Sequence, residues 1–326
     1  MPARQGGRPR AGLLALFPAL VLAAALAPCP AGAGEAVVTA QVANLVDIVD
    51  LDAGKVVAAI PVSGAPAGVA LSPDRRTAYV TRPDGPGLAV IDLAARRVSA
   101  TLPLPGGPLG IAVNPVSGAV YVADWYAKRV LVLLPKPEGL VQDGEIAVGQ
   151  SPSGFAVAPD GRTLLVANRE SDTVSVVDIE SRREVRTIAV GKHPFGIALD
   201  AGAMRAYTAN VESNDVSVID LAKGAEIGRV TSGDRPYVVA LAGGRGFVTD
   251  QYSGTVTAFD LATLKPLKAI DTGDHPEGIA ASADGRTVYA TNWGDNTLSV
   301  IDVGTLAVTR QIKVDDGPRA FGDFLR

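Results

Sequence analysis

The chain has two histidines and two tryptophans, and all four stand beside the same kind of local pattern. His193 and His275 each precede a proline, whereas Trp125 and Trp293 each follow the Asp or Asn that ends a short apolar run. Imidazole titrates near neutral pH and can transfer protons. Indole offers a flat surface for an apolar or π-faced body. These four positions are therefore the first place to look for chemistry.

Arginine and glutamate occupy neighbouring positions of the same pattern. Arg235 precedes a proline as the histidines do, and Arg319 and Glu277 each follow one. Two histidines and two arginines form, by composition, an anion-binding set, because guanidinium is the usual bidentate partner of carboxylate and phosphate. The candidate ligand-binding residues are His193, Arg235, His275, Arg319, Glu277, Phe195, Tyr237, Trp125, Tyr126, Trp293, Arg169 and Asp250. The competing interpretation is a set of solvated loop residues without a ligand.

A repeat of about 42 residues generates these positions. Its anchors are Pro66, Pro108, Pro152, Pro194, Pro236, Pro276 and Pro318. Each anchor begins an apolar strand, and a turn such as Asp160-Gly161 leads to a second strand such as Tyr289-Ala290-Thr291. A third strand ends in Asp, as in Val176–Asp178, and a fourth returns to the next proline. Four short strands at this period are typical of one blade of a β-propeller.

The repeat residues carry a resemblance to a known family. Tyr-Val-Thr-Asn-like second strands, Ser-Val-Ile-Asp third strands and Pro-x-Gly-Ile-Ala first strands resemble those of the YVTN-repeat β-propellers, over residues 36–326. The resemblance implies an all-β, seven-bladed propeller of a secreted or periplasmic protein, often with a binding or accessory role. Because one fold hosts many functions, the role must be argued from the site.

The chain ends predict how the ring closes. Residues 36–43 form a second strand, followed by a third strand that ends at Asp50 and a fourth at 56–62, so this blade lacks its first strand. Residues 318–325 form a seventh anchor segment with no blade of its own. We predict that they pair with residues 36–43, because pairing the two ends removes an open sheet edge.

The same architecture predicts one functional face. The prolines and the ends of the second strands, taken as Asn44, Arg82, Asp124, Asn168, Asn210, Asp250 and Asn292, lie at the same end of each blade because consecutive strands are antiparallel. This upper face surrounds the mouth of the central channel. All the candidate residues fall on it, and loop residues there are free to vary with function.

The first 33 residues have the pattern of a signal peptide. Arginines precede the apolar run Leu13–Ala27, and Ala31-Gly32-Ala33 is a small-residue cleavage site. We therefore expect residues 1–33 to be removed, residues 34–326 to form the propeller, and the protein to be periplasmic or secreted and off the membrane after cleavage. The one cysteine, Cys29, lies in the removed segment, so the mature protein has no disulfide or thiolate site.

Charge and missing motifs limit the function. The formal net charge of −4 becomes −7 without the three arginines of the leader, so nucleic-acid binding is not expected. No nucleophile elbow or phosphate-binding loop is present. Two histidines on different blades cannot readily share a metal ion, and no cofactor is predicted. The sequence favours a monomeric, non-catalytic propeller that binds a small anionic ligand or a periplasmic protein partner, accessory to a redox or catabolic system. The alternative is a lactonase- or cycloisomerase-like enzyme using His, Arg and Glu at the channel mouth.

Overall fold

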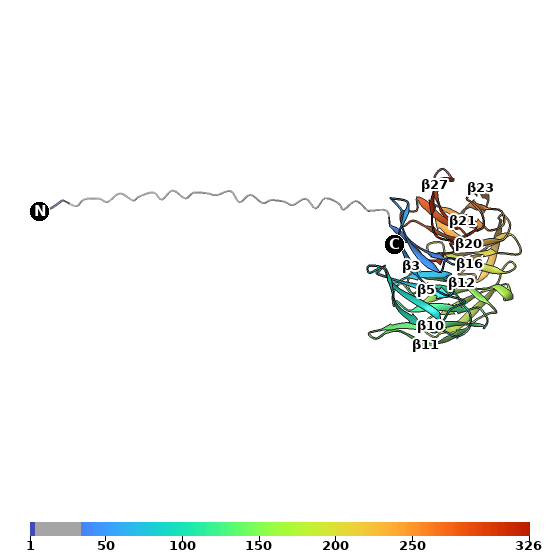
Figure 1. Cartoon of the computed structure of the whole chain (residues 1–326), viewed down its shortest axis with the longest axis horizontal. Coiled ribbons are helices and arrows are strands. Elements are labelled where there is room, and N and C mark those ends of the chain that lie inside the picture. Colours follow the sequence, from blue (N-terminus) through green and yellow to red (C-terminus); the bar gives the residue numbers. More distant parts are fainter. Residues whose placement is uncertain (4–33) are drawn as a thin grey trace. The chain divides into compact units, whose positions relative to one another are not determined.

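The structure is a computed structural model that describes residues 1–3 and 34–326. The predicted signal peptide therefore lies, except for its first three residues, outside the described part. Residues 34–326 form seven β-sheets arranged around a central channel, as the repeat predicts (Figure 1). The described residues contain no helix long and apolar enough to cross a membrane.

Each blade is an antiparallel meander. Blades 1 to 3 contain β1 (Glu35–Ala40), β2 (Leu45–Asp50), β3 (Lys55–Pro61); β4 (Gly68–Leu71), β5 (Thr77–Arg82), β6 (Gly87–Asp92), β7 (Arg97–Leu102); and β8 (Pro108–Val113), β9 (Val120–Asp124), β10 (Arg129–Lys136), β11 (Gly139–Ala147). Blades 4 and 5 contain β12 (Pro152–Val157), β13 (Thr163–Asn168), β14 (Thr173–Asp178), β15 (Arg183–Ala189); and β16 (Pro194–Asp200), β17 (Arg205–Asn210), β18 (Asp215–Asp220), β19 (Ala225–Thr231). Blades 6 and 7 contain β20 (Pro236–Ala242), β21 (Arg245–Asp250), β22 (Thr255–Asp260), β23 (Pro266–Asp271); and β24 (Pro276–Ala281), β25 (Thr287–Asn292), β26 (Thr297–Asp302), β27 (Ala307–Lys313). A short 3₁₀ turn, η1 (Arg169–Ser171), follows β13.

The position of each strand in its blade explains its burial. The second and third strands, such as β13 and β14, are buried along most of their length because neighbouring blades cover both faces. The fourth strands, such as β15, form the outer edge and are mostly exposed. The recurring aromatic residues of the second strands pack in the core: Tyr79, Tyr121, Tyr207, Phe247 and Tyr289 are all buried.

The chain ends close the ring as predicted, with one added feature. Backbone hydrogen bonds join Val37 N–H to the Phe324 carbonyl and Arg319 N–H to the Thr39 carbonyl, both at 2.8 Å. In Figure 1 the C-terminus lies beside the blue N-terminal strands. Between these contacts, β28 (Phe321–Gly322) pairs in parallel with β4 of blade 2. The C-terminal segment therefore joins blade 1 to blade 2 as well as completing blade 1.

Two boundaries differ from the expectation. The second strand of blade 1 ends at Ala40, and Asn44 lies four residues further on, in the turn before β2. Its side-chain oxygen accepts hydrogen bonds from Gly64 and Ala65 N–H, at 2.9 and 3.0 Å. In blade 3 the third strand ends in Leu133-Leu134-Pro135 without the usual Asp, which predicts a longer loop over residues 136–144. The structure has mostly strand there, because β10 and β11 extend into a hairpin.

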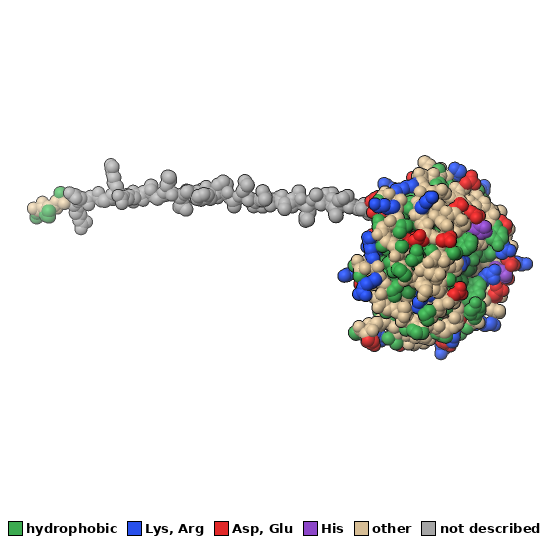
Figure 2. Space-filling model, in the orientation of Figure 1, with side chains coloured by type: hydrophobic (Ala, Val, Ile, Leu, Met, Phe, Trp, Pro, Cys, Tyr) green, Lys and Arg blue, Asp and Glu red, His purple; other side chains and the backbone are tan. Residues whose placement is uncertain are grey.

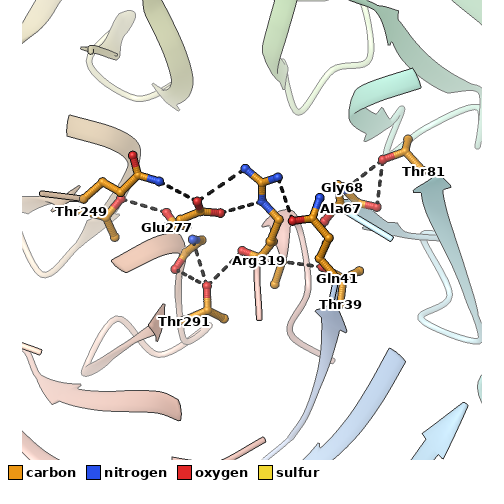
Figure 3. A network of polar contacts seen from close by, with 12 residues as sticks. Thr39, Gln41, Ala67, Gly68, Thr81, Thr249, Glu277, Thr291 and Arg319 are labelled. Atoms are coloured by element: carbon orange, nitrogen blue, oxygen red, sulfur yellow. Dashed lines mark hydrogen bonds and ion pairs between the residues drawn. The ribbon is translucent and has the colours of Figure 1, made fainter. Parts of the chain in front are cut away.

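Threonine hydroxyls join several blades to the next. Thr81, for example, accepts a hydrogen bond from Gly68 N–H of its own blade and donates one to the Leu109 carbonyl of blade 3, both at 2.8 Å. Thr39, Thr249 and Thr291 donate in the same way to carbonyl groups of the following blade (Figure 3). A small hydroxyl suits this narrow contact, where an inner strand approaches the adjacent blade.

Candidate functional site

The residues before the anchor prolines share an unusual backbone conformation. His193, Arg235 and His275 have φ values of +55°, +52° and +52°, in the left-handed region. Ala65 and Ser151, at the equivalent positions of other blades, have φ values of +54° and +50°. The strain therefore belongs to a turn that most blades share, and it does not by itself mark a ligand site. What distinguishes blades 5 to 7 is the choice of cation-capable side chains there.

Four aromatic side chains gather at the upper mouth of the channel. Phe195 lies 4.2 Å from Tyr237 and 5.2 Å from Phe321, measured between ring centroids, and Trp125 lies 6.4 Å from Phe195. Phe195 and Tyr237 come from the inner strands β16 and β20, where each directly follows its anchor proline. We call these four residues, with Arg169, Glu277 and Arg319, the mouth cluster. Phe321 was missed because it lies three residues after its anchor proline, whereas Phe195 and Tyr237 directly follow theirs.

A buried ion pair lies beside these rings. Arg319 Nε donates to Glu277 Oε2 at 2.6 Å, and Arg319 Nη1 donates to Gln41 Oε1 at 3.2 Å (Figure 3). Gln251 Nε2 donates to Glu277 Oε1 at 2.6 Å, and the Arg319 guanidinium also lies over the Phe321 ring at 4.7 Å. Both carboxylate oxygens and most of the guanidinium are thus engaged within the protein.

Burial controls the acid–base properties of the mouth cluster. It raises the pKa of Glu277, while Arg319 and Gln251 oppose the shift by stabilising the charged form. Burial, reinforced by the negative charge of Glu277, raises the pKa of Tyr237 to about 12. The Tyr237 phenol therefore stays protonated at neutral pH and remains a hydrogen-bond donor.

A second group lies on the rim of the upper face. The Arg235 guanidinium lies 5.0 Å from the Tyr252 ring, Tyr252 lies 5.5 Å from His275, and His275 lies 6.4 Å from Trp293. The ring contacts are edge-to-face, with interplanar angles of 67° and 66°. We call these four residues the rim ladder. Tyr252 is 58% exposed, so the ladder presents aromatic surface to solvent.

In the predicted anion-binding set of His193, Arg235, His275 and Arg319, most members lie against acidic neighbours. His193 Nδ1 lies 3.0 Å from Glu212 Oε1, and His275 Nδ1 lies 2.7 Å from Asp274 Oδ1. Arg169 pairs with Glu170 and stacks on Trp125 at 5.7 Å. Within residues 1–3 and 34–326, Arg235 makes no ion pair, which leaves it the most available cation of the predicted set.

The remaining candidates lie in contrasting surroundings. Asp250 is fully buried, and it accepts hydrogen bonds from Gly233 N–H and from the Thr255 and Thr257 hydroxyls, at 3.0, 2.9 and 2.6 Å. Burial raises its pKa to about 6. Its oxygens hold the turn together and do not reach the mouth. Tyr126, by contrast, is 82% exposed on the same face.

The turns of the upper face differ in charge around the ring. Those of blades 4 to 7 carry eight carboxylates against three Lys or Arg, whereas those of blades 1 to 3 carry one of each. Figure 2 shows histidine on one side of the propeller, among red acidic and blue basic side chains. The sector that holds the rim ladder is therefore aromatic and acidic overall, although its sequence positions first suggest a basic pocket.

The channel below the mouth cluster is lined by the inner strands. A small cavity of about 50 Å³ lies among Leu109, Phe155, Phe195 and Phe321. A larger cavity of about 470 Å³ lies among the ends of the inner strands that face away from the prolines, and Asp323 contributes to its wall. Among the residues that the structure describes, no group of three or more His, Asp or Glu could hold a metal ion.

Comparisons with known proteins establish the fold. No family model matches the chain, and no curated protein matches it. Among solved structures, the chain is similar to Kuenenia stuttgartiensis hydrazine synthase, with a TM-score of 0.70, 19% identity, and coverage of 78% of this chain and 88% of that one. It is also similar to a functionally unknown protein from Desulfotomaculum acetoxidans, with a TM-score of 0.73, 15% identity, and coverage of 89% and 100%.

A third similar structure is a dihydro-heme d1 dehydrogenase, NirN, in complex with its ligand DHE. The TM-score is 0.66 and the identity 17%, over 88% of this chain and 74% of that chain. At these identities the comparisons support a seven-bladed β-propeller, and the function has to be argued from the residues described above.

Proposed function

We propose that this protein is an exported, non-catalytic propeller that binds a partner protein through its upper face. The observation that carries the proposal is the rim ladder, in which Arg235, Tyr252, His275 and Trp293 follow one another across an exposed surface. Tyrosine, tryptophan and arginine are the residues that most often dominate the binding energy of protein interfaces. Their rings lose little conformational freedom on binding, which favours tight contacts.

The charge pairs favour a protein over a small anion as the main ligand. Arg319 is already bound to Glu277, and both histidines lie against carboxylates. An entering anion would have to displace these groups. A partner surface can instead pack on exposed rings and leave the internal pairs intact.

The resemblance to YVTN-repeat propellers and the predicted leader support a location in the periplasm or outside the cell. One of the similar structures is named a dihydro-heme d1 dehydrogenase, and a dehydrogenase carries out redox chemistry. We therefore favour an accessory role in a periplasmic redox or catabolic system. The protein itself would be the binding component, without a cofactor of its own.

Partner capture with matched variants tests the proposal. The mature protein is immobilised and exposed to extract from the source cells, and bound proteins are crosslinked and identified by mass spectrometry. Tyr252→Ser combined with Trp293→Ser should abolish capture of the specific partner. Val116→Ser, which alters an exposed apolar residue (69% exposed) in the turn before β9, serves as the control and should leave capture unchanged. Equal capture by both variants would exclude the rim ladder as the docking surface.

A small anion remains a second candidate because Arg235 makes no ion pair in the described part of the chain. Binding of phosphate, sulfate or acetate should then strengthen as the pH falls from about 7.5 to 5.5, where histidine gains its charge. Calorimetry at pH 6 with Arg235→Ala as control checks this, and a lost hydrogen bond to a charged group costs about 1.5–3 kcal/mol. No saturable binding of any of the three anions would remove this candidate.

The catalytic alternative has one observation in its favour, the raised pKa of the buried Glu277. Against it, both oxygens of Glu277 already accept hydrogen bonds from Arg319 and Gln251. Turnover of lactone substrates that is lost in Glu277→Gln would favour a lactonase-like enzyme. Absence of turnover favours the binding function.

A further inference from the structure

Blade 2 is the only blade with a basic residue at the end of its second strand, among residues 34–326. At the end of the second strand, blades 4, 5 and 7 place an Asn whose amide donates to polar groups five and seven residues later. Asn168 donates to the Thr173 and Ser175 hydroxyls at 3.1 and 2.8 Å, and Asn292 donates to those of Thr297 and Ser299, both at 2.9 Å. Blade 2 has Arg82 at this position, where β5 pairs with Gly87 of β6.

The surroundings of Arg82 offer no replacement for those partners. The residues five and seven positions later are Gly87 and Ala89, which carry no polar side-chain atom. Arg82 is only 4% exposed, its Nε is buried without a hydrogen-bond partner, and Nη2 makes one long contact of 3.4 Å with the Leu88 carbonyl. Within residues 34–326 no carboxylate forms an ion pair with it.

A covered guanidinium in this state lacks a counter-charge. Burial lowers the pKa of Arg82, but arginine keeps its proton in proteins. An unpaired charge removed from water is strongly unfavourable unless an opposite charge or several acceptors compensate it. The edge of the guanidinium that carries Nε and Nη2 is the edge left short of acceptors, and it matches the two oxygens of a carboxylate.

We infer that Arg82 is an anion site for a small carboxylate. Two glycine-containing turns cover the Arg82 side chain and limit the size of a ligand that could bind it. A Cβ added to Gly64 would lie 2.6 Å from Gly85 Cα and 3.4 Å from Arg82 Cβ, so the turns at 62–65 and 83–86 meet closely here. This close approach favours a group the size of formate or acetate over a bulky ligand. The site is independent of partner binding at the rim ladder.

The rival counter-ion is internal. Asp84 lies two residues from Arg82 in the covering turn, where its backbone N–H donates to the Gly64 carbonyl at 3.2 Å. Its side chain forms no ion pair with Arg82 in the structure. The experiment therefore needs an arm that separates an external carboxylate from Asp84.

The test compares thermal stability in sodium formate and in sodium chloride at equal ionic strength. The mature protein should melt about 3 °C higher in saturating formate, because a ligand that binds the folded state raises its stability. Arg82→Asn combined with Ala89→Ser installs the Asn–Ser pair of blades 4 and 7, and it should abolish the formate effect while preserving the fold. Arg82→Lys, which keeps the charge without the planar fork, should reduce it.

Calorimetric titration of formate into the unaltered protein gives a second readout that does not depend on the variants. Saturable binding at one site per chain supports the inference. An equal formate effect in the unaltered protein and in the Asn–Ser variant, or none in either, would overturn it. A formate effect that appears only in Asp84→Asn would also overturn it, since Asp84 would then be the counter-ion.

Discussion

Blades 6, 7, 1 and 2 are joined to their neighbours differently from blades 3, 4 and 5. In the first arc, a threonine hydroxyl near the end of the second strand donates to a carbonyl of the next blade at 2.8–2.9 Å; these residues are Thr249, Thr291, Thr39 and Thr81. In the second arc the equivalent residues are Ala123, Ala167 and Ala209. The threonine arc is centred on blade 1, where the ring closes without a covalent link.

The contrast identifies where the ring needs reinforcement. A covalent turn connects each blade to the next except at the seam, which the C-terminal segment closes by hydrogen bonds and packing. Thr39 contributes directly, since its hydroxyl accepts from Ala320 N–H of that segment and donates to the Ala67 carbonyl of blade 2, both at 2.8 Å. In the alanine arc, the Ser153 hydroxyl contacts the Phe195 carbonyl at 3.1 Å and supplies part of the same link.

Removal of residues 318–326 should have the largest effect on stability, because these residues close the ring at the seam. It removes the buried Ala320, Phe321 and Phe324, and it leaves the buried Glu277 without Arg319. The uncompensated buried charge and the lost core packing together cost more free energy than the net stability of most domains. We expect an aggregated protein, or a melting temperature lower by more than about 10 °C, measured by calorimetry and light scattering.

A circular permutant is the matched control. Glu35 N–H donates to the Arg326 carbonyl at 2.9 Å, so a short linker can join the ends, with new termini in the turn 201–204 between β16 and β17. The permutant should fold with near-normal stability. A truncated protein that stays monomeric and equally stable would mean that the C-terminal segment does not close the ring.

The sequence predicted the ring because the repeat places each proline opposite the end of its second strand. The pairs Pro152–Asn168 and Pro276–Asn292 have the expected register. The prediction placed Asn44 wrongly, because blade 1 ends its second strand in Ala40 and has an Asn four residues later in the turn. The repeat period alone does not show whether Ala40 or Asn44 ends this strand.

The candidate site was less accessible to sequence reasoning. His193, His275 and Arg319 all lie beside anchor prolines, but their partners Glu212, Asp274 and Glu277 determine whether they act as free cations. Such pairings depend on side-chain directions across turns, which spacing does not encode. Tyr252 belongs to the rim ladder and could have been included from its position beside Gln251, in the turn equivalent to that of Trp293.

Blade 1, where the ring closes, contains a buried carboxylate that should make the stability of the protein depend on pH. Asp47 occupies the place where blades 4, 5 and 7 have Ser175, Ser217 and Ser299, and it is fully buried. Burial raises its pKa from 3.8 to about 7, and the nearby Asp315 contributes, although its backbone N–H opposes the shift by donating to Asp47 at 2.8 Å. Because the unfolded chain loses this proton first, stability should fall as the pH rises from about 4 to about 7 and then level off.

Asp47→Asn removes this dependence. The variant should match the unaltered protein near pH 4 and exceed its free energy of unfolding by a few kcal/mol at pH 8, in chemical denaturation. Asp250→Asn gives blade 6 the residue of blades 4, 5 and 7, and it should give a smaller gain because burial raises the pKa of Asp250 only to about 6. If Asp47→Asn is less stable than the unaltered protein at pH 8, the carboxylate contributes more to the seam than its burial costs.

The smallest expected effect separates the seam from the rest of the threonine arc. Thr39→Val and Thr249→Val each remove one hydroxyl that accepts from a backbone N–H and donates to the next blade. Both should lower the free energy of unfolding by about 1–2 kcal/mol, as expected when buried partners lose a hydrogen bond. Equilibrium stability alone therefore does not distinguish them.

The two variants should differ in local opening, because Thr39 contacts a segment held without a covalent turn on that side. Thr39→Val should speed amide hydrogen exchange at Val37 and Arg319, whose N–H groups bond across the seam, whereas Thr249→Val should leave both rates unchanged. Equal acceleration in the two variants would mean that the ring opens as one cooperative unit and that the seam has no separate stability to reinforce.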